Sequence, residues 1–453
     1  MEVKEKTLYG LSYSQEIIDL QTKYALFKRV VNILFSLTFD EGYDPELMKK
    51  ALDLLYQRND CLRLRFVKKD KKVMQYFLPE AHPGQICTMN FPTEQAFESF
   101  MLKYRKKGLD MYKGECLEVI FATNPSGKQM LICKVNHFVA DTYGIGVLVG
   151  DLCGIYDALK NGKELPAAPG SFEEIIRKDN EYRANEEQVE KDREFFKEYY
   201  EKRHAERPIY CSIHGEKAER WMAQKRKGKI SMPYFFFRCD TTGFQYIIPA
   251  AVSEKVEKWC TEKELPLGTF YYYAFTLASS LVNGKETRPT VSLELLNCRG
   301  TVADRKAAGT KVQSLAIVSG VDYGKSFLDN AKVLYGEQSE LYRHTRLTYL
   351  ELEDMQHKQW NYSMLGSVNG FSFSFIPMAM PKGIQFQVYS NGKGALVAYI
   401  AMVMDPESKE IAVTYDVQDL LITKEILEDF QKYYVQVIEK VLAGDDKPLS
   451  KIF

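Results

Sequence analysis

One short stretch of this chain, residues 129–159, restricts the fold more than any other part of the sequence. A two-residue period in side-chain polarity predicts a strand over 129–139. One face of that strand carries Leu131, Cys133, Val135, His137 and Val139. The apolar residues of 144–159 then recur at helical spacing and form a broad face. A strand that leads directly into a helix with a buried face predicts an α/β fold.

The rest of the chain repeats this alternation of strand and helix signals. A helix signal begins at Asp44-Pro45 and ends near Arg58, and a final helix begins after Thr423. Residues 161–220 are the most polar stretch and separate two halves of similar style. We therefore predict two α/β lobes, residues 1–175 and 176–453, paired about a central cleft or tunnel. The alternative for the polar stretch is an exposed helix that decorates a single domain.

Charge and hydropathy exclude several classes of protein. Lys plus Arg and Asp plus Glu each number 61, so the chain lacks the basic excess expected of a nucleic-acid-binding protein. No apolar run reaches the ~18–20 residues that span a bilayer. The first ten residues lack the apolar segment of a secretory signal. We therefore expect a cytoplasmic protein with no membrane span and no nucleic-acid partner.

Nine cysteines are present, and their spacing does not favour a metal site. None forms a CxxC pair, and none stands beside a histidine at zinc-ligand spacing. Several lie in apolar runs, so the cysteines are interpreted as buried, reduced thiols. We expect no metal and no permanently bound cofactor.

The residues between the predicted strand and helix carry the chemistry. His137 stands at the strand end, Asp141 follows four residues later, and the helix begins at once. An imidazole on a rigid support can take a proton from an attacking amine or hydroxyl near neutral pH. The same spacing also arises by chance, and the alternative for His137 is a core histidine with no chemical role.

The whole segment 136–152 resembles the condensation domains of non-ribosomal peptide synthetases. Their signature is two histidines, three variable residues, Asp-Gly and an apolar helix. Further resemblances follow in the family's order along nearly the whole chain. These are Leu11-Ser12-Tyr13-Ser14-Gln15, the arginine-rich run Arg58 to Phe66, Leu296-Asn297-Cys298-Arg299, and the diverged motif Gly309 to Leu315.

The resemblance implies two chloramphenicol-acetyltransferase-like lobes with a tunnel between them. It places His137 at the catalytic position, as a general base or as a residue that aligns the nucleophile. It implies that Asp141 pairs with an arginine; the first candidate partner is Arg299 and the second is Arg63. The residues expected to have structural roles at the site are Asp141, Arg299, Asn136 and Arg63. Candidate contacts to the tunnel or substrate are Thr142, Gly144, Gln313 and Ser314.

Three residues depart from the family's pattern. Asn136 replaces the first histidine, and its amide can still hydrogen-bond. Thr142 replaces the glycine after the aspartate, and we expect it to cap the helix. Gln313 replaces an asparagine, which keeps the amide but lengthens the side chain by one methylene. These changes predict a divergent subfamily.

The resemblance implies acyl transfer from a thioester to an amine or hydroxyl, giving an amide or an ester. Because the sequence matches one stand-alone domain, we expect the donor in trans, as a phosphopantetheine-linked acyl group on a carrier protein or as a coenzyme A thioester. The basic run 225–229 is a solvated face or, alternatively, a dock for an acidic carrier protein. The competing hypothesis is a catalytically silent binding or scaffold protein, which Asn136 and Thr142 favour. A metal-dependent hydrolase is a distant third, since the six histidines are not clustered.

Overall fold

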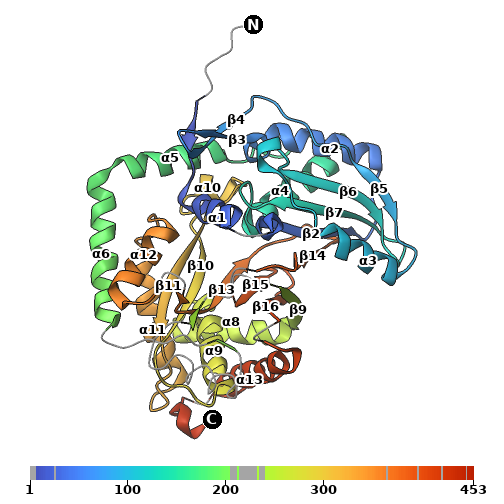
Figure 1. Ribbon diagram of the computed structural model, residues 1–453. Helices are drawn as coiled ribbons and strands as arrows, with labels where there is room; N and C mark the ends of the chain where they lie inside the picture. The colour runs from blue at the N-terminus through green and yellow to red at the C-terminus, as the bar shows by residue number, and fades with distance from the viewer. Residues whose placement is uncertain are drawn as a thin grey trace. The chain divides into compact units, whose positions relative to one another are not determined.

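The computed structural model contains both helices and sheets, so the predicted α/β class is confirmed (Figure 1). It describes residues 7–24, 27–204, 212–213, 232–233, 240–363, 366–394, 397–419, 422–444 and 446–453. Two compact units are present. The first contains Met1–Glu186, Asn297–Val312 and Met378–Lys393, and the second contains Glu187–Leu296, Gln313–Pro377 and Gly394–Phe453.

A five-stranded sheet forms the centre of the first unit. Its order is β14 (Ile384–Tyr389), β2 (Asn32–Phe39), β7 (Gln129–Asn136), β6 (Leu117–Thr123) and β5 (Cys87–Asn90). The first four strands pair antiparallel, and β5 pairs parallel with β6. Around it lie α1 (Tyr13–Tyr24), α2 (Pro45–Arg58), α3 (Glu94–Tyr104), α4 (Thr142–Asn161), α5 (Phe172–Ala184) and α10 (Val302–Lys306). A small sheet, β1 (Tyr9–Gly10), β4 (Lys72–Phe77) and β3 (Leu64–Lys69), completes the unit.

Both faces of the central strand β7 are buried, which explains why it carries apolar residues on each side. Leu131, Cys133 and Val135 belong to a large core with residues of α2 and α4. Met130 and Ile132, on the opposite face, pack with residues of α3 in a smaller core. The two-residue period therefore predicts the facing of these side chains correctly, and the double burial holds the end of β7 in place.

A six-stranded sheet forms the centre of the second unit. Its order is β11 (Val312–Ser319), β10 (Thr290–Asn297), β13 (Asn369–Pro377), β15 (Ala398–Met404), β16 (Ile411–Gln418) and β9 (Thr241–Ile248). The helices are α6 (Glu186–His204), α8 (Ala250–Lys263), α9 (Leu267–Val282), α11 (Phe327–Leu341), α12 (Tyr349–Trp360) and α13 (Lys424–Leu442). Short strands β8 (Met232–Pro233) and β12 (Gly366–Ser367) pair with each other.

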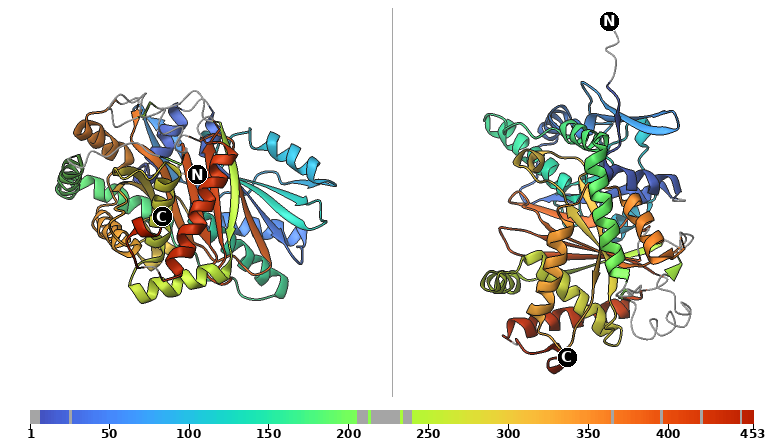
Figure 2. Two further views of the ribbon diagram at one scale, coloured as in Figure 1. Left: turned by 90° about the horizontal axis from the view of Figure 1, so that it is seen from below. Right: turned by 90° about the vertical axis from the view of Figure 1, so that its left-hand side faces the viewer.

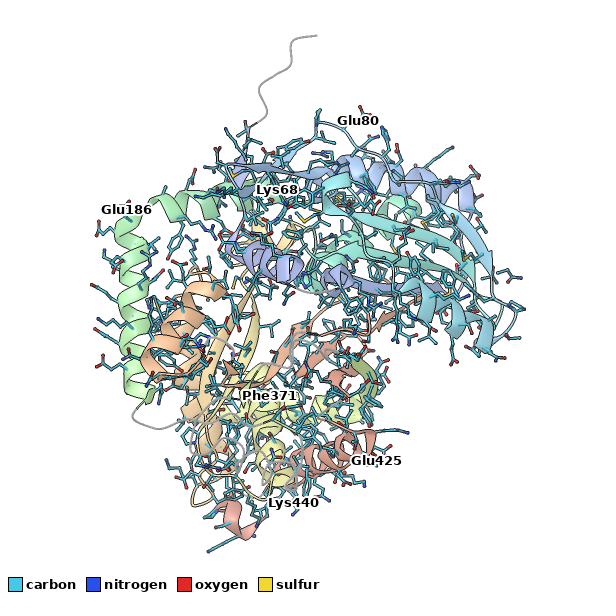
Figure 3. The ribbon with its side chains drawn as sticks, viewed as in Figure 1. Lys68, Glu80, Glu186, Phe371, Glu425 and Lys440 are labelled. Carbon is cyan, nitrogen blue, oxygen red and sulfur yellow. The ribbon has the colours of Figure 1, made fainter. Side chains whose placement is uncertain are left out.

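The core of the second unit is rich in aromatic side chains. Helices α9 and α13 pack side by side (Figures 1 and 2). The run from Phe270 to Tyr273 on α9 is almost fully buried. Phe371 on β13 lies in the same core, whereas Glu425 lies on the exposed side of α13 (Figure 3). The Tyr272 ring of this run lies 6.3 Å from the Phe371 ring, so the aromatic residues of α9 and β13 pack against each other.

The predicted lobe boundary at residue 175 falls inside α5. The two units are discontinuous in sequence, whereas the predicted lobes are continuous stretches. The reason is that β14 completes the first sheet by pairing with β2, and 297–312 packs with the first unit. The polar stretch after residue 171 forms two helices, α5 and α6, rather than one exposed helix. Phe172, Ile176, Phe196 and Tyr200 are fully buried on them. The pseudo-dimer with a central tunnel stays a prediction.

The described cysteines are not all buried, in contrast to the prediction. Cys61, Cys116, Cys133 and Cys260 are buried, but Cys87 on the edge strand β5 is exposed. Cys211, Cys239 and the basic run 225–229 lie outside the described residues. None of the described helices has the length and apolar character needed to cross a membrane.

A buried carboxyl in the second unit is held by uncharged groups. Glu294 on β10 accepts hydrogen bonds from the Gln338 amide at 2.9 and 3.0 Å and from the Tyr342 hydroxyl at 2.7 Å. Burial raises the pKa of Glu294 from its usual 4.5 to about 7, despite these bonds. The fold therefore favours the protonated acid over the carboxylate.

We expect this acid to make the protein less stable as pH rises. The folded pKa lies above the unfolded value, so the folded state holds the proton more tightly. Stability should fall between about pH 4.5 and pH 7 and then level off, by a few kcal/mol in total. Denaturant melts of Glu294→Gln should lose this component of the pH dependence. An unchanged pH profile in the variant would contradict the assignment.

Candidate functional site

His137 lies in a turn that joins β7 to α4. Strand β7 ends at Asn136, so the predicted strand to Val139 is three residues too long. The chain leaves the sheet because Asn136 holds the turn: its side-chain Oδ1 accepts from Phe138 N at 3.1 Å, and its carbonyl accepts from Val139 N at 3.0 Å. His137 N donates to Val31 O at 2.8 Å. The amide that replaces the family's first histidine thus has a defined structural contact.

Asp141 begins helix α4 as its N-cap. Its Oδ1 accepts a hydrogen bond from Gly144 N at 2.7 Å, and its backbone is extended. The expectation that Thr142 caps this helix is wrong, because Thr142 is already its first helical residue. A carboxylate at this position satisfies an open backbone N–H and interacts favourably with the helix dipole.

Arg299 is the cation that pairs with Asp141. Its two terminal nitrogens contact the two carboxylate oxygens at 3.0 and 3.1 Å, a bidentate ion pair. The Arg299 side chain is fully buried, and that of Asp141 is nearly so. Lys311 N donates to Asp141 Oδ2 at 2.8 Å, and Arg299 donates to Gly309 O at 2.7 Å. The Tyr143 ring centre lies 4.8 Å from the guanidinium carbon. Both charged groups of the pair are therefore well satisfied.

Burial and charge set the protonation states at this site. Burial lowers the pKa of His137, and the Asp141 carboxylate offsets this only in part. Burial alone would raise the pKa of Asp141, but Arg299 and the N–H donors of Gly144 and Lys311 lower it below its usual value. The arrangement therefore favours a neutral imidazole beside an ionised carboxylate at neutral pH.

Two glycines bring the start of α4 against the loop 307–311, which follows α10. A Cβ on Gly144 would lie 2.5 Å from Gly309 O and 3.1 Å from Gly309 N. Gly309 itself has φ +107°, and a Cβ there would meet the Phe172 ring at 2.2 Å. Gly144 thus serves close packing of two backbones, which is a structural reason for a residue that the sequence offered only as a tunnel or substrate contact.

We expect Gly144→Ala to destabilise the protein by about 1–3 kcal/mol, because backbone atoms cannot yield to the new methyl group. Gly150→Ala on the same helix is the matched control, since a Cβ there would meet nothing within 4 Å. That change should stabilise by about 0.5–1 kcal/mol through helix propensity. Thermal melts of both variants check the prediction, and equal effects would contradict it.

Arg63 does not reach Asp141. Its guanidinium donates to the carbonyls of Leu78 at 3.0 Å, Tyr56 at 3.4 Å and Gln57. The rest of the arginine-rich run is also engaged in packing. Arg58 pairs with Asp151 at 3.0 Å, and Asp60 accepts from Phe172 N and Glu173 N at the start of α5.

Gln313 and Ser314 belong to the second unit. The Gln313 amide donates to Thr345 O at 3.1 Å and to Leu347 O, and its oxygen accepts from Ser314 N at 2.9 Å. These bonds give Gln313 a structural role within that unit. Substrate contact by Gln313, Ser314 or Thr142 stays a prediction.

Several residues at this site were missed by sequence reasoning. The Thr310 hydroxyl donates to His137 O, Lys311 N holds Asp141, and Gln15 Nε2 donates to Phe138 O at 3.1 Å. Gln15 is the last residue of the Leu-Ser-x-x-Gln motif, and Thr310 and Lys311 lie in the motif Gly309 to Leu315. Neither motif shows which atoms of residues 137–141 these residues contact, because both motifs lie far from residue 137 in the sequence.

The Condensation domain family model matches residues 5–453. The chain belongs to this family. The resemblance stated from the sequence is therefore confirmed. Two curated relatives come from Bacillus subtilis (strain 168): a plipastatin synthase, 20% identical over 96% of this chain, and surfactin synthase subunit 1, 18% identical over 99%. The chain spans only 16% and 12% of the lengths of these relatives.

Solved condensation domains share the fold. The starter condensation domain of rhizomide synthetase, in complex with C8-CoA and Leu-SNAC, matches with a TM-score of 0.78 at 18% identity, covering 98% of this chain and 96% of that one. The first condensation domain of the calcium-dependent antibiotic synthetase, in complex with a substrate analogue, gives a TM-score of 0.78 at 16% identity, covering 98% and 99%. At such identities, these likenesses establish the condensation-domain fold.

Metal-binding groups and cavities are two further kinds of candidate site, away from His137. Among the described residues, no group of three or more histidine, cysteine, aspartate or glutamate side chains is placed to hold a metal ion. A cavity of about 570 Å³ lies in the second unit, and its lining includes Arg203, Tyr273, Ser319, Asp322 and Glu337. None of the residues predicted for the site lines it.

Proposed function

We propose that this condensation-family chain transfers an acyl group from a thioester to an amine or hydroxyl. The nucleophilic nitrogen or oxygen attacks the thioester carbonyl and loses its proton. The carbon–sulfur bond breaks, the thiol leaves with a proton, and an amide or ester forms. Such a transfer needs a base, alignment and stabilisation of developing charge, all of which protein groups can supply.

The observation that carries this proposal is the environment of the His137 ring. The ring is half-buried, and its Nδ1 is enclosed without a hydrogen-bond partner among the described residues. Nε2 is then the nitrogen left for a substrate. Because burial lowers the pKa of His137, the imidazole is neutral and can accept a proton at neutral pH.

Asp141 acts on structure in this proposal and does not relay a proton. Oδ1 accepts from Gly144 N and Arg299, and Oδ2 accepts from Lys311 N and Arg299. With these four bonds, each oxygen already holds two donors. The carboxylate therefore fixes the start of α4 and the loop 309–311 around His137.

The donor and acceptor are inferred from chemistry and from relatives. A solved relative was crystallised with C8-CoA and Leu-SNAC, an acyl thioester and an amine-bearing thioester. We propose a phosphopantetheine-linked acyl group on a carrier protein, or an acyl-coenzyme A, as the donor, and a small amine or alcohol as the acceptor. No permanently bound cofactor is required, and a cytoplasmic location stays a prediction.

The proposal is tested with purified protein and an acyl-coenzyme A or acyl-carrier donor against a panel of amines and alcohols. Mass spectrometry should detect the amide or ester, with equal yield in the presence of a chelator. Activity abolished by the chelator and restored by metal would contradict the proposal. Absence of product with every donor would favour the silent binding or scaffold protein.

A further inference from the structure

The peptide planes that follow His137 are held by the neighbouring Asn136 side chain and by two side chains distant in sequence, Thr310 and Gln15. The carbonyl of His137 accepts from the Thr310 hydroxyl, and Phe138 N donates to Asn136 Oδ1. The carbonyl of Phe138 accepts from Gln15 Nε2 at 3.1 Å. The direction of the imidazole depends on these planes, because the side chain adds only two torsions of its own.

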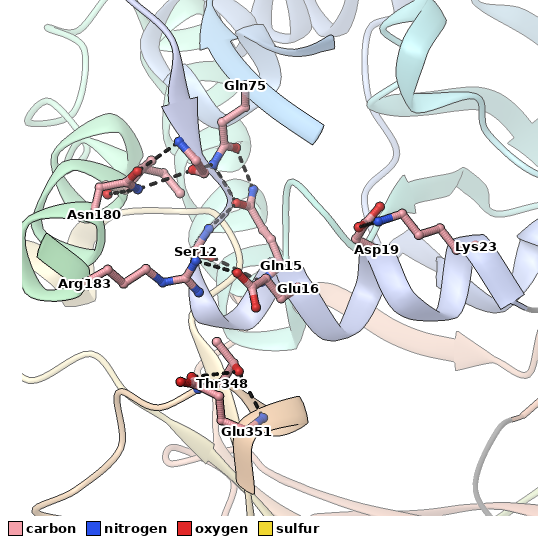
Figure 4. Close-up of polar contacts among 12 residues, drawn as sticks. Ser12, Gln15, Glu16, Asp19, Lys23, Gln75, Asn180, Arg183, Thr348 and Glu351 are labelled. Carbon is pink, nitrogen blue, oxygen red and sulfur yellow. Dashed lines mark hydrogen bonds and ion pairs between the residues drawn. The ribbon is translucent and has the colours of Figure 1, made fainter. Parts of the chain in front are cut away.

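Gln15 is fully buried, and each of its polar positions is used. Its Nε2 donates to Phe138 O and, at 2.9 Å, to Gln75 Oε1. Its Oε1 accepts from Ser12 N at 3.0 Å and from Gln75 Nε2 at 2.8 Å. The two glutamines thus exchange hydrogen bonds in both directions (Figure 4). A carboxamide can do this because it has two donors and two acceptor positions.

Gln75 ties this pair to the N-terminal strand. Also fully buried, it lies on β4 and donates to Gly10 O at 2.7 Å (Figure 4). Gly10 N also donates to Asn180 Oδ1 on α5 at 2.9 Å. A continuous series of hydrogen bonds therefore connects β1 through the glutamine pair to the carbonyl next to His137, and both glutamines are shielded from water.

We propose that Gln15 and Gln75 are positioning residues for His137. The inference rests on the proposed function and deepens it: the buried amide pair fixes the 138 carbonyl, and with it the direction in which His137 Nε2 points. A base must be held within about 0.5 Å of its productive position. A shift of about 1 Å can cost roughly 100-fold in rate.

The test compares Gln15→Leu with Asn180→Ala. Each change removes hydrogen bonds to the N-terminal segment, from Gln15 to Ser12 or from Asn180 to Gly10. The other bond of the Asn180 side chain goes to the Ile176 carbonyl on α5, away from residues 136–141. Gln15→Leu should lower kcat by about tenfold to 100-fold with KM little changed. Asn180→Ala should lower the melting temperature yet keep kcat. Gln75→Leu, which reaches the Phe138 carbonyl only through Gln15, should give a smaller kcat loss, and it decides the question if Gln15→Leu does not fold.

A second readout does not depend on turnover. With histidine labelled at Cε1, the six histidines give NMR signals, and the one absent in His137→Ala belongs to His137. Gln15→Leu should shift and broaden that signal, and Asn180→Ala should leave it in place. An unchanged His137 signal and kcat in Gln15→Leu, or equal losses in Asn180→Ala, would overturn the inference. If the wild type transfers no acyl group, the proposed function fails while the NMR comparison still decides the positioning.

Discussion

His137→Ala should lower acyl transfer by about 10²–10⁴-fold and leave the protein folded. That range is the usual contribution of a positioned general base. The fold should survive because the turn around residue 137 is held by backbone and neighbouring side chains: Val31 O, the Thr310 hydroxyl and the Asn136 amide. Removing the imidazole leaves no partner of Nδ1 unsatisfied among the described residues, since that nitrogen has none there. Turnover of an acyl thioester, with melting temperature measured alongside, checks the prediction.

A second histidine provides the matched control for this change. His82 is exposed and pairs with Asp53 and Glu80 on the surface. His82→Ala should keep full activity, since these surface partners lie outside the network that holds residues 136–141. Full turnover in His137→Ala would defeat the proposed role. A loss well below the general-base range would favour alignment of the nucleophile over proton transfer.

Asp141→Ala should destabilise the protein by about 3–5 kcal/mol, because it leaves the buried Arg299 guanidinium without its carboxylate. It also removes the acceptors of Gly144 N and Lys311 N. Denaturant unfolding measures the change. Unaltered stability together with lost activity would show that the carboxylate serves the chemistry directly.

A double-mutant cycle measures how strongly Asp141 and Arg299 are coupled in stability. Arg299→Leu should cost a similar amount, since it leaves the buried Asp141 carboxyl without its cation. Asp141→Leu combined with Arg299→Leu should cost clearly less than the sum of the two, because neither charge remains. Arg177→Ala, which breaks an exposed ion pair with Glu174 on α5, should change stability little. Additive losses at residues 141 and 299 would contradict a coupled pair.

Much of the local structure near the site was predictable from the sequence. The Asp44-Pro45 signal gives the start of α2, with Asp44 as cap. The periodicity gives β7 and α4, although the strand ends at Asn136 because its side chain bonds to Phe138 N. The order of motifs indicated the family, and through it Arg299 as the partner of Asp141. Thr142 was wrongly expected to cap α4, because a carboxylate one residue earlier already does so.

The class of fold, the family and the place of His137 between a strand and a helix all follow from the order of residues along the chain. Periodicity and capping act over a few residues, so neighbours in the sequence reveal them. The packed structure was needed to show that β14 completes the first sheet and that Gln75, Thr310 and Lys311 hold the turn around His137. Buried polar groups must find partners wherever the packed chain supplies them, and that requirement leaves no pattern in the local sequence.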